Sequence, residues 1–142
     1  MEWKQLLSDK RYGHVSSKKT SDLRTEFQRD YHRIIGSASF RRLQDKTQVF
    51  PLDRGDFVRT RLTHSLEVAS FAKSLGQMCF AYIMQNNLDE SIDESIKADI
   101  CNILECAGLL HDIGNPPFGH FGETAIREWF RNNLGKLSLD GI

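Results

Sequence analysis

The sequence has few of the features that anchor a protein in a membrane or cross-link it covalently. No segment approaches the roughly 18 consecutive apolar residues that a membrane span requires, and the first residues contain no hydrophobic signal region. Only three cysteines occur, Cys79, Cys101 and Cys106, and no two form a CxxC pair. Neither a disulfide framework nor a cysteine zinc site is therefore indicated. We expect a cytoplasmic protein with reduced cysteines and no membrane partner.

Two motifs typical of nucleotide-binding and hydrolytic proteins, the P-loop and the G-x-S-x-G elbow, are also absent. The net charge is zero but unevenly divided. Residues 11–61 contain twelve Lys and Arg against six acidic residues, whereas residues 62–142 contain five against eleven. This division permits a phosphate-rich partner for the first half, including nucleic acid, and a cation for the second. Solvated helix faces explain it equally well.

A chain of 142 residues with 39% hydrophobic content has the size and composition of one domain. Its apolar residues recur at spacings of three and four, which predicts an all-α fold. A segment with Pro51 and Gly55 interrupts the pattern and is interpreted as a loop over residues 45–60. Five helices are expected. The first begins near Ser21 or Asp22 and ends at Gly36, and the next two cover 39–46 and 61–85. The fourth starts from a capping box of Ser91 and Glu94 and runs through Leu110, and the last covers 123–134.

Two histidines lie at the ends of neighbouring apolar stripes. His64 precedes a stripe through Val68, Ala72, Leu75, Cys79 and Tyr82, and His111 follows one through Ile96, Ile100, Ile103 and Ala107. Antiparallel or crossing helices could bring the two imidazoles together, with Asp112 beside them. Two imidazoles and a carboxylate suit a divalent Mn, Fe, Co or Zn ion, and Mg remains an option. Each histidine alone could equally be a hydrogen-bonded core residue.

Three segments in this order resemble a known family: FRRLQDKTQVFPL at 40–52, RTRLTHSLEV at 59–68 and LLHDIGNPPFGHFGE at 109–123. They are similar to the HD-domain phosphohydrolases, and more narrowly to the deoxyguanosine triphosphate triphosphohydrolases. The resemblance implies an HD-domain-like helical bundle over residues 21–142, preceded by an N-terminal extension over 1–20. It also implies a divalent metal cofactor and hydrolysis of a deoxynucleoside triphosphate, expected to be dGTP, to deoxynucleoside and inorganic triphosphate.

The resemblance also assigns roles residue by residue. His64, His111 and Asp112 match metal ligands, and His120 and Glu123 match the pair that handles protons. Three further matches concern the substrate: Gln48 to the deoxyribose, Arg61 to the phosphates and Asn115 to the α-phosphate. From the residues alone, Glu123 could instead interact with a helix N-terminus and Asn115 could cap a helix.

One part of the family pattern has no convincing match. HD domains take a final aspartate ligand from a later helix, and the only acidic residue after Glu128 is Asp140, 28 positions beyond Asp112. We therefore expect the N-terminal portion of such a bundle, incomplete at its C-terminal end. Apolar helix faces left exposed would favour a homo-oligomer. Two alternatives to the dGTPase reading stay open: a catalytically silent metal- or nucleotide-binding fragment, and an HD phosphohydrolase with another nucleotide or a phosphodiester as substrate.

Overall fold

The computed structural model describes residues 7–10, 22–48 and 58–136, and every regular element among them is helical. Extended structure in these ranges is limited to one isolated antiparallel bridge between Thr47 and Thr60. The all-α prediction is confirmed, and no described helix is long and apolar enough to cross a membrane. The elements are α2 (Glu26–Gly36), α3 (Ala38–Arg41), the 3-10 helix η1 (Arg42–Asp45), α4 (Arg61–Gln85), α5 (Glu94–Leu110), α6 (Gly119–Asn133) and the 3-10 helix η2 (Leu134–Lys136).

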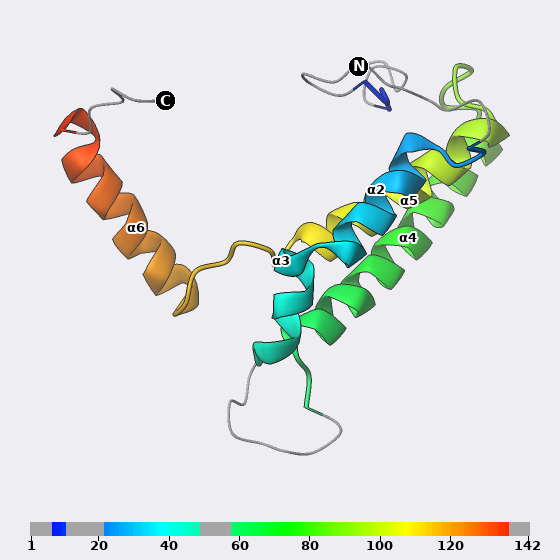
Figure 1. The fold of residues 1–142 in the computed structure, drawn as a ribbon. Coiled ribbons are helices and arrows are strands. Elements are labelled where there is room, and N and C mark those ends of the chain that lie inside the picture. The colour runs from blue at the N-terminus through cyan, green and yellow to red at the C-terminus, as the bar shows by residue number, and fades with distance from the viewer. Residues whose placement is uncertain (1–6, 11–21, 49–57, 137–142) are drawn as a thin grey trace.

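Helices α4 and α5 lie side by side and form the centre of the molecule, with α2 packed on α5 and α3 and η1 beside the start of α4 (Figure 1). A small core of Phe40, Leu43, Ala69 and Leu109 joins these elements. Each of its members is at most 5% exposed. The core therefore lies at the end of the bundle where α4 begins and α5 ends.

Small residues allow α4 and α5 to approach closely. A Cβ atom added to Gly108 would lie 2.5 Å from the Cα of Ala69 and 2.8 Å from its backbone nitrogen. One added to Gly76 would lie 2.7 Å from the Leu104 side chain. A larger side chain at Gly108 would meet the backbone of α4 and force the helices apart, whereas at Gly76 the end of the Leu104 side chain would have to move. Gly108 therefore sets the separation of the two helices at this end.

The predicted buried stripes are wrong in detail. Helix α4 buries Ser65, Ala69, Gly76 and Phe80, whereas Leu75 and Tyr82 are 59% and 63% exposed. Helix α5 likewise buries Cys101, Cys106, Gly108 and Leu109, while Ala107 is exposed. Apolar residues occur on more than one side of α4. Where α4 lies closest to α5, the small residues Ala69 and Gly76 are buried, whereas Phe80 is a large side chain that is buried further along the helix.

Capping side chains explain where the helices begin. Helix α2 begins at Glu26 rather than near Ser21 or Asp22, because the Thr25 hydroxyl accepts from the Gln28 N–H and Gln28 Oε1 accepts from the Thr25 N–H. Helix α5 is capped by Asp93 and not by Ser91, whose hydroxyl donates to Asp89 instead. Helix α4 has the predicted bounds. The loop around Pro51 and Gly55, the extension over 1–20 apart from residues 7–10, and Asp140 lie outside the described residues.

Helix α6 stands apart from the other helices (Figure 1) and buries none of its residues. It begins at Gly119, four residues earlier than predicted. The expected apolar stripe is present but exposed: Ile126, Trp129 and Phe130 are 49%, 53% and 48% accessible. Positive φ angles occur at Gly114 and Phe118, between α5 and α6, and at Gly119, the first residue of α6. Glycine adopts this backbone conformation without steric cost, whereas a side-chain-bearing residue such as Phe118 rarely adopts it.

Candidate metal centre

The contact between α4 and α5 brings three predicted site residues together. The rings of His64 and His111 meet edge to face, with 5.1 Å between their centroids and an interplanar angle of 73°. One ligand atom from each of His64, His111 and Asp112 can be chosen so that all three lie within 4.8 Å of one another. Two imidazole nitrogens and a carboxylate oxygen are thus arranged so that a single cation could contact all three.

The local fold positions each histidine. Helix α4 begins with a capping box between Thr60 and Thr63, which sets the orientation of its first turns and hence of His64. His111 follows the last residue of α5, three positions after Gly108. The absence of a side chain at Gly108 lets the end of α5 pack directly against the backbone of Ala69 near the start of α4. The close helix contact therefore also supports the candidate metal centre.

A backbone hydrogen bond orients the His111 imidazole. Its Nδ1 lies 2.6 Å from the carbonyl oxygen of Gly108. A carbonyl only accepts, so Nδ1 carries the proton and donates, and Nε2 retains its lone pair. Histidines that ligate metals typically donate their second ring nitrogen to a carbonyl or carboxylate in this way. His111 therefore offers Nε2 as a ligand atom.

Asp112 supplies the observation that tests whether a cation fits. The residue is 7% exposed, and its Oδ1 accepts a hydrogen bond of 2.6 Å from Asn115 Nδ2. Its Oδ2 is buried and has no hydrogen-bond partner among the described residues. A buried carboxylate oxygen without a partner is unfavourable, and a bound cation would satisfy it. The donor set and its unsatisfied oxygen therefore suit a divalent metal ion.

Two predicted substrate residues lie where the chain enters α4. The Gln48 N–H donates to the Arg59 carbonyl at 3.1 Å, and the Arg61 N–H donates to the Lys46 carbonyl at 2.8 Å. These bonds flank the bridge between Thr47 and Thr60 and hold Gln48 beside the helix start. Gln48 Oε1 is buried without a partner among the described residues. Arg61 is half-buried and lies one turn before His64.

The predicted proton-handling pair lies on α6. His120 Nδ1 is 3.3 Å from Glu123 Oε2, and the early start of the helix puts both residues on one face. The His120 side chain is fully exposed. The structure therefore brings these two residues to each other but does not include them in the cluster of His64, His111 and Asp112.

Asn115 and Gly108 were not anticipated in the positions that they occupy. Asn115 does not cap α5, whose C-cap is His111. Its side-chain amide instead donates a hydrogen bond to Asp112. Its sequence neighbours gave no signal for this contact. A glycine inside a predicted helix, by contrast, does indicate a close backbone approach, and Gly108 could have been identified on that basis.

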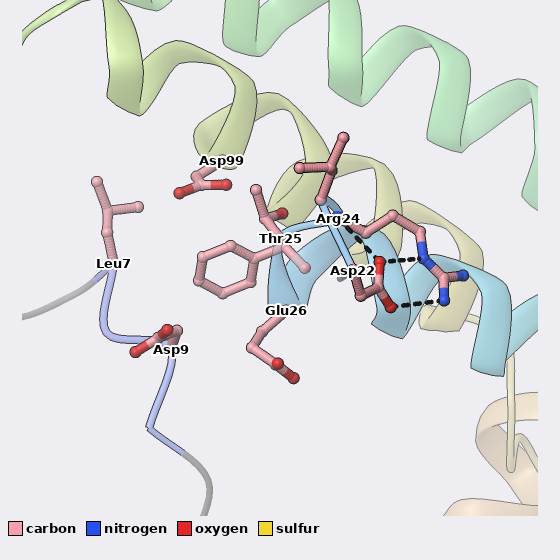
Figure 2. A pocket seen from close by; sticks show the side chains of 9 residues that line it. Leu7, Asp9, Asp22, Arg24, Thr25, Glu26 and Asp99 are labelled. Atoms are coloured by element: carbon pink, nitrogen blue, oxygen red, sulfur yellow. Dashed lines mark hydrogen bonds and ion pairs between the residues drawn. The ribbon is translucent and has the colours of Figure 1, made fainter. Parts of the chain in front are cut away.

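A separate hollow of about 330 Å³ lies at the N-terminal end of α2 and contains none of the predicted site residues (Figure 2). Its carboxylates include Asp22, which accepts hydrogen bonds from the guanidinium groups of Arg24 and Arg29. The bonds from Arg24 hold the pKa of Asp22 well below its usual range. The lining residues are Leu7, Asp9, Asp22, Leu23, Arg24, Thr25, Glu26, Phe27 and Asp99. Among the residues that the structure describes, the histidine cluster is the group able to hold a metal ion.

Comparison with protein families settles the lineage. Residues 61–137 match the family model of the HD domain. The chain belongs to the HD domain family. This segment contains His64, His111, Asp112 and the whole of α4, α5 and α6. HD domains typically bind divalent metal ions, in agreement with the cluster seen here.

Curated relatives of this HD-domain chain are named for one activity. A deoxyguanosinetriphosphate triphosphohydrolase-like protein of Listeria monocytogenes is 57% identical over 97% of the chain, and one of Synechocystis is 49% identical over 99%. A deoxyguanosinetriphosphate triphosphohydrolase of Salmonella schwarzengrund is 50% identical over 76% of the chain. The chain spans 30%, 31% and 22% of the length of these relatives, respectively. The resemblance to the N-terminal portion of dGTPase-like proteins is confirmed.

Proposed function

We propose that this HD-domain chain contributes a divalent metal centre to the hydrolysis of a deoxynucleoside triphosphate, with dGTP as substrate and deoxyguanosine and inorganic triphosphate as products. The observation that carries the proposal is the Oδ2 of Asp112, which is buried without a hydrogen-bond partner in the described part of the chain and lies in a cluster with His64 and His111. The names of the relatives support the choice of substrate.

His64, His111 and Asp112 would hold the ion. When bound, a divalent metal acts as a Lewis acid on phosphate oxygens and lowers the pKa of a coordinated water. The Gly108 carbonyl fixes the imidazole of His111 so that Nε2 is presented. Manganese, magnesium, cobalt, iron and zinc all tolerate a mixed nitrogen and oxygen donor set, and the three side chains do not select one of them.

The other predicted residues act on the substrate. The planar guanidinium of Arg61 offers a permanent charge and paired N–H donors to the triphosphate. The amide of Gln48 can donate to and accept from a 3′-hydroxyl, and its buried Oε1 lacks any other partner among the described residues. The contact of Asn115 with the α-phosphate stays a prediction; Nδ2 donates one N–H to Asp112, and the amide has a second N–H.

We assign proton transfer to His120, with Glu123 as its orienting partner. The carboxylate lies next to Nδ1, so a proton held on Nδ1 leaves Nε2 to accept or deliver a proton at the scissile phosphate. This role requires α6 to approach the bundle. The chain that joins α5 to α6 would have to change conformation for α6 to do so.

A second candidate function is a metal- or nucleotide-binding fragment without turnover. Two observations favour it: the cluster has three protein ligands among the described residues, and His120 lies outside it. An HD phosphohydrolase acting on another nucleotide or on a phosphodiester is a third candidate.

We also propose that the chain self-associates, because α4 exposes an apolar row of Phe71, Leu75, Met78 and Tyr82. A monomer in sedimentation velocity at micromolar concentration would contradict that part.

Product analysis tests the proposed function. The purified chain is incubated with dGTP and Mn²⁺, and deoxyguanosine and inorganic triphosphate are quantified against a His111→Ala background. Equal amounts of both products above that background support triphosphohydrolase activity. A folded sample that binds Mn²⁺ but yields neither product favours the silent fragment. Release of pyrophosphate or monophosphate instead would indicate a different phosphohydrolase.

A further inference from the structure

We infer that Asn115 is a positioning residue for the metal centre and acts through Asp112. The inference rests on the proposed function, because it assumes that Asp112 is a metal ligand. It assigns the Asn115 side chain a task that precedes any contact with substrate: to fix the carboxylate so that one defined oxygen meets the ion.

The geometry supplies the first argument. Asn115 Nδ2 donates to Asp112 Oδ1 at 2.6 Å, a short bond for an amide donor and a carboxylate. With Oδ1 held in this way, rotation of the carboxylate about its terminal bond is restricted. Oδ2 has no hydrogen-bond partner among the described residues and is therefore the oxygen left for a cation.

The backbone between Leu110 and Asn115 forms a turn that accompanies the contact of Asn115 with Asp112. The Ile113 N–H donates to the Leu110 carbonyl at 3.0 Å and continues the turn beyond the end of α5. Gly114 then adopts φ +89°, a conformation that side-chain-bearing residues rarely adopt. The turn over residues 111–114 ends at this glycine, and the Asn115 side chain that follows it donates to Asp112. Gly114 and Asn115 thus work together to orient the ligand.

The chemistry of the donor supplies the second argument. A carboxamide is neutral, so it can hold a carboxylate without placing a positive charge next to the cation. A lysine or arginine would hold the same oxygen but would repel the ion and compete with it for the negative charge. A neutral donor is therefore suited to orient Asp112 while leaving its charge available.

Cobalt binding to the purified chain tests the inference without relying on turnover. Co²⁺ is titrated by calorimetry, and its d–d absorption spectrum reports the ligand geometry. Loss of a residue that orients a metal ligand typically weakens metal affinity about 10- to 100-fold. We expect Asn115→Ala to weaken Co²⁺ binding within that range and to change the spectrum. Asn115→Gln, which keeps an amide donor, should recover part of the affinity.

Asn86→Ala is the matched control. Asn86 also follows a long helix, and its Nδ2 donates to the Tyr82 carbonyl at 2.8 Å, so its loss removes a comparable amide hydrogen bond away from the cluster. Its Co²⁺ affinity and spectrum should equal those of the unsubstituted chain. Circular dichroism shows whether each variant is folded. If Asn115→Ala does not fold, the Co²⁺ affinity and spectrum of Asn115→Gln are compared with those of the unsubstituted chain. The longer side chain displaces the amide donor, so weaker Co²⁺ binding and an altered spectrum are expected.

The outcomes separate the inference from the function on which it rests. If Asp112→Ala abolishes Co²⁺ binding while Asn115→Ala and Asn115→Gln bind as tightly as the unsubstituted chain with the same spectrum, the metal centre stands and the positioning role is refuted. A loss in Asn115→Gln as large as in Asn115→Ala would also count against the amide donor. If Asp112→Ala binds normally, or the unsubstituted chain binds no Co²⁺, the metal centre is wrong and the inference falls with it.

Discussion

Replacement of Gly108 by alanine should loosen both the helix pair and the candidate metal centre. The new methyl group would meet the backbone of α4, at 2.5 Å from Ala69 Cα, 2.8 Å from Ala69 N and 3.1 Å from the Val68 carbonyl carbon. These atoms belong to a helix and cannot rotate away as a flexible side chain could. Helices α4 and α5 must therefore move apart by about 1 Å to restore ordinary contact distances.

The expected magnitude combines two opposing effects. Overpacking of this kind costs about 1–3 kcal/mol, and three close backbone contacts place Gly108→Ala near the upper end. Alanine inside a helix returns about 1 kcal/mol relative to glycine. The net loss should be about 2 kcal/mol, which corresponds to a decrease in Tm of roughly 4–8 °C for a chain of this size.

Thermal unfolding followed by circular dichroism measures this effect, with Gly36→Ala as the control. A Cβ at Gly36, the last residue of α2, meets nothing within 4 Å, so that variant should be as stable as the original or slightly more stable. Gly108→Ala should also bind Co²⁺ more weakly, because the displaced Gly108 carbonyl holds His111. Unchanged Tm and unchanged metal affinity in Gly108→Ala would refute the link between helix spacing and the site.

Three further predictions concern the substrate, the proton and the thiols. Arg61→Ala should raise the Kd for dGTP at least tenfold while Arg131→Ala on α6 leaves it unchanged, and equal affinities by calorimetry would remove Arg61 from the phosphate site. His120→Ala should retain Mn²⁺ affinity but lower turnover about 10²- to 10⁴-fold, and full activity would defeat its role in proton transfer. Burial raises the pKa of the Cys106 thiol to about 11, whereas Cys79 is exposed. Since the thiolate is the reactive form, iodoacetamide at pH 8 should label Cys79 well before Cys106, and mass spectrometry showing equal labelling would contradict the packing of α5 against α2.

Capping residues and the spacing of apolar residues were sufficient to predict the bounds of α4 and the helical class of the fold. Helix α4 begins and ends as predicted because Thr60 caps a long helical stretch and the polar segment around Asn86 ends it. The meeting of His64 and His111 could also be anticipated, since each lies at the end of a helix that packs against its neighbour. The all-α class follows from the same periodicity.

The buried faces could not be derived from apolar spacing. Helix α4 has apolar residues on several sides, so hydrophobicity alone did not identify Ala69 and Gly76 as the contact residues. Ala69 and Gly76 face α5 because their small size lets the two helices approach closely, which a residue as large as Leu75 would prevent. The separation of α6 from the bundle was likewise not visible in the pattern of Ile126, Trp129 and Phe130, which is equally typical of a packed helix.

The number of metal ions bound per chain shows whether His111 and Asp112 hold an ion. The unsubstituted chain, His111→Ala, Asp112→Ala and the control His120→Ala are equilibrated with Mn²⁺, and the bound metal per chain is measured. We expect one bound ion in the unsubstituted chain and in His120→Ala, and a loss of bound metal in His111→Ala and Asp112→Ala. Equal stoichiometry and affinity in all four proteins would show that His111 and Asp112 do not hold the ion and would contradict the proposed metal centre.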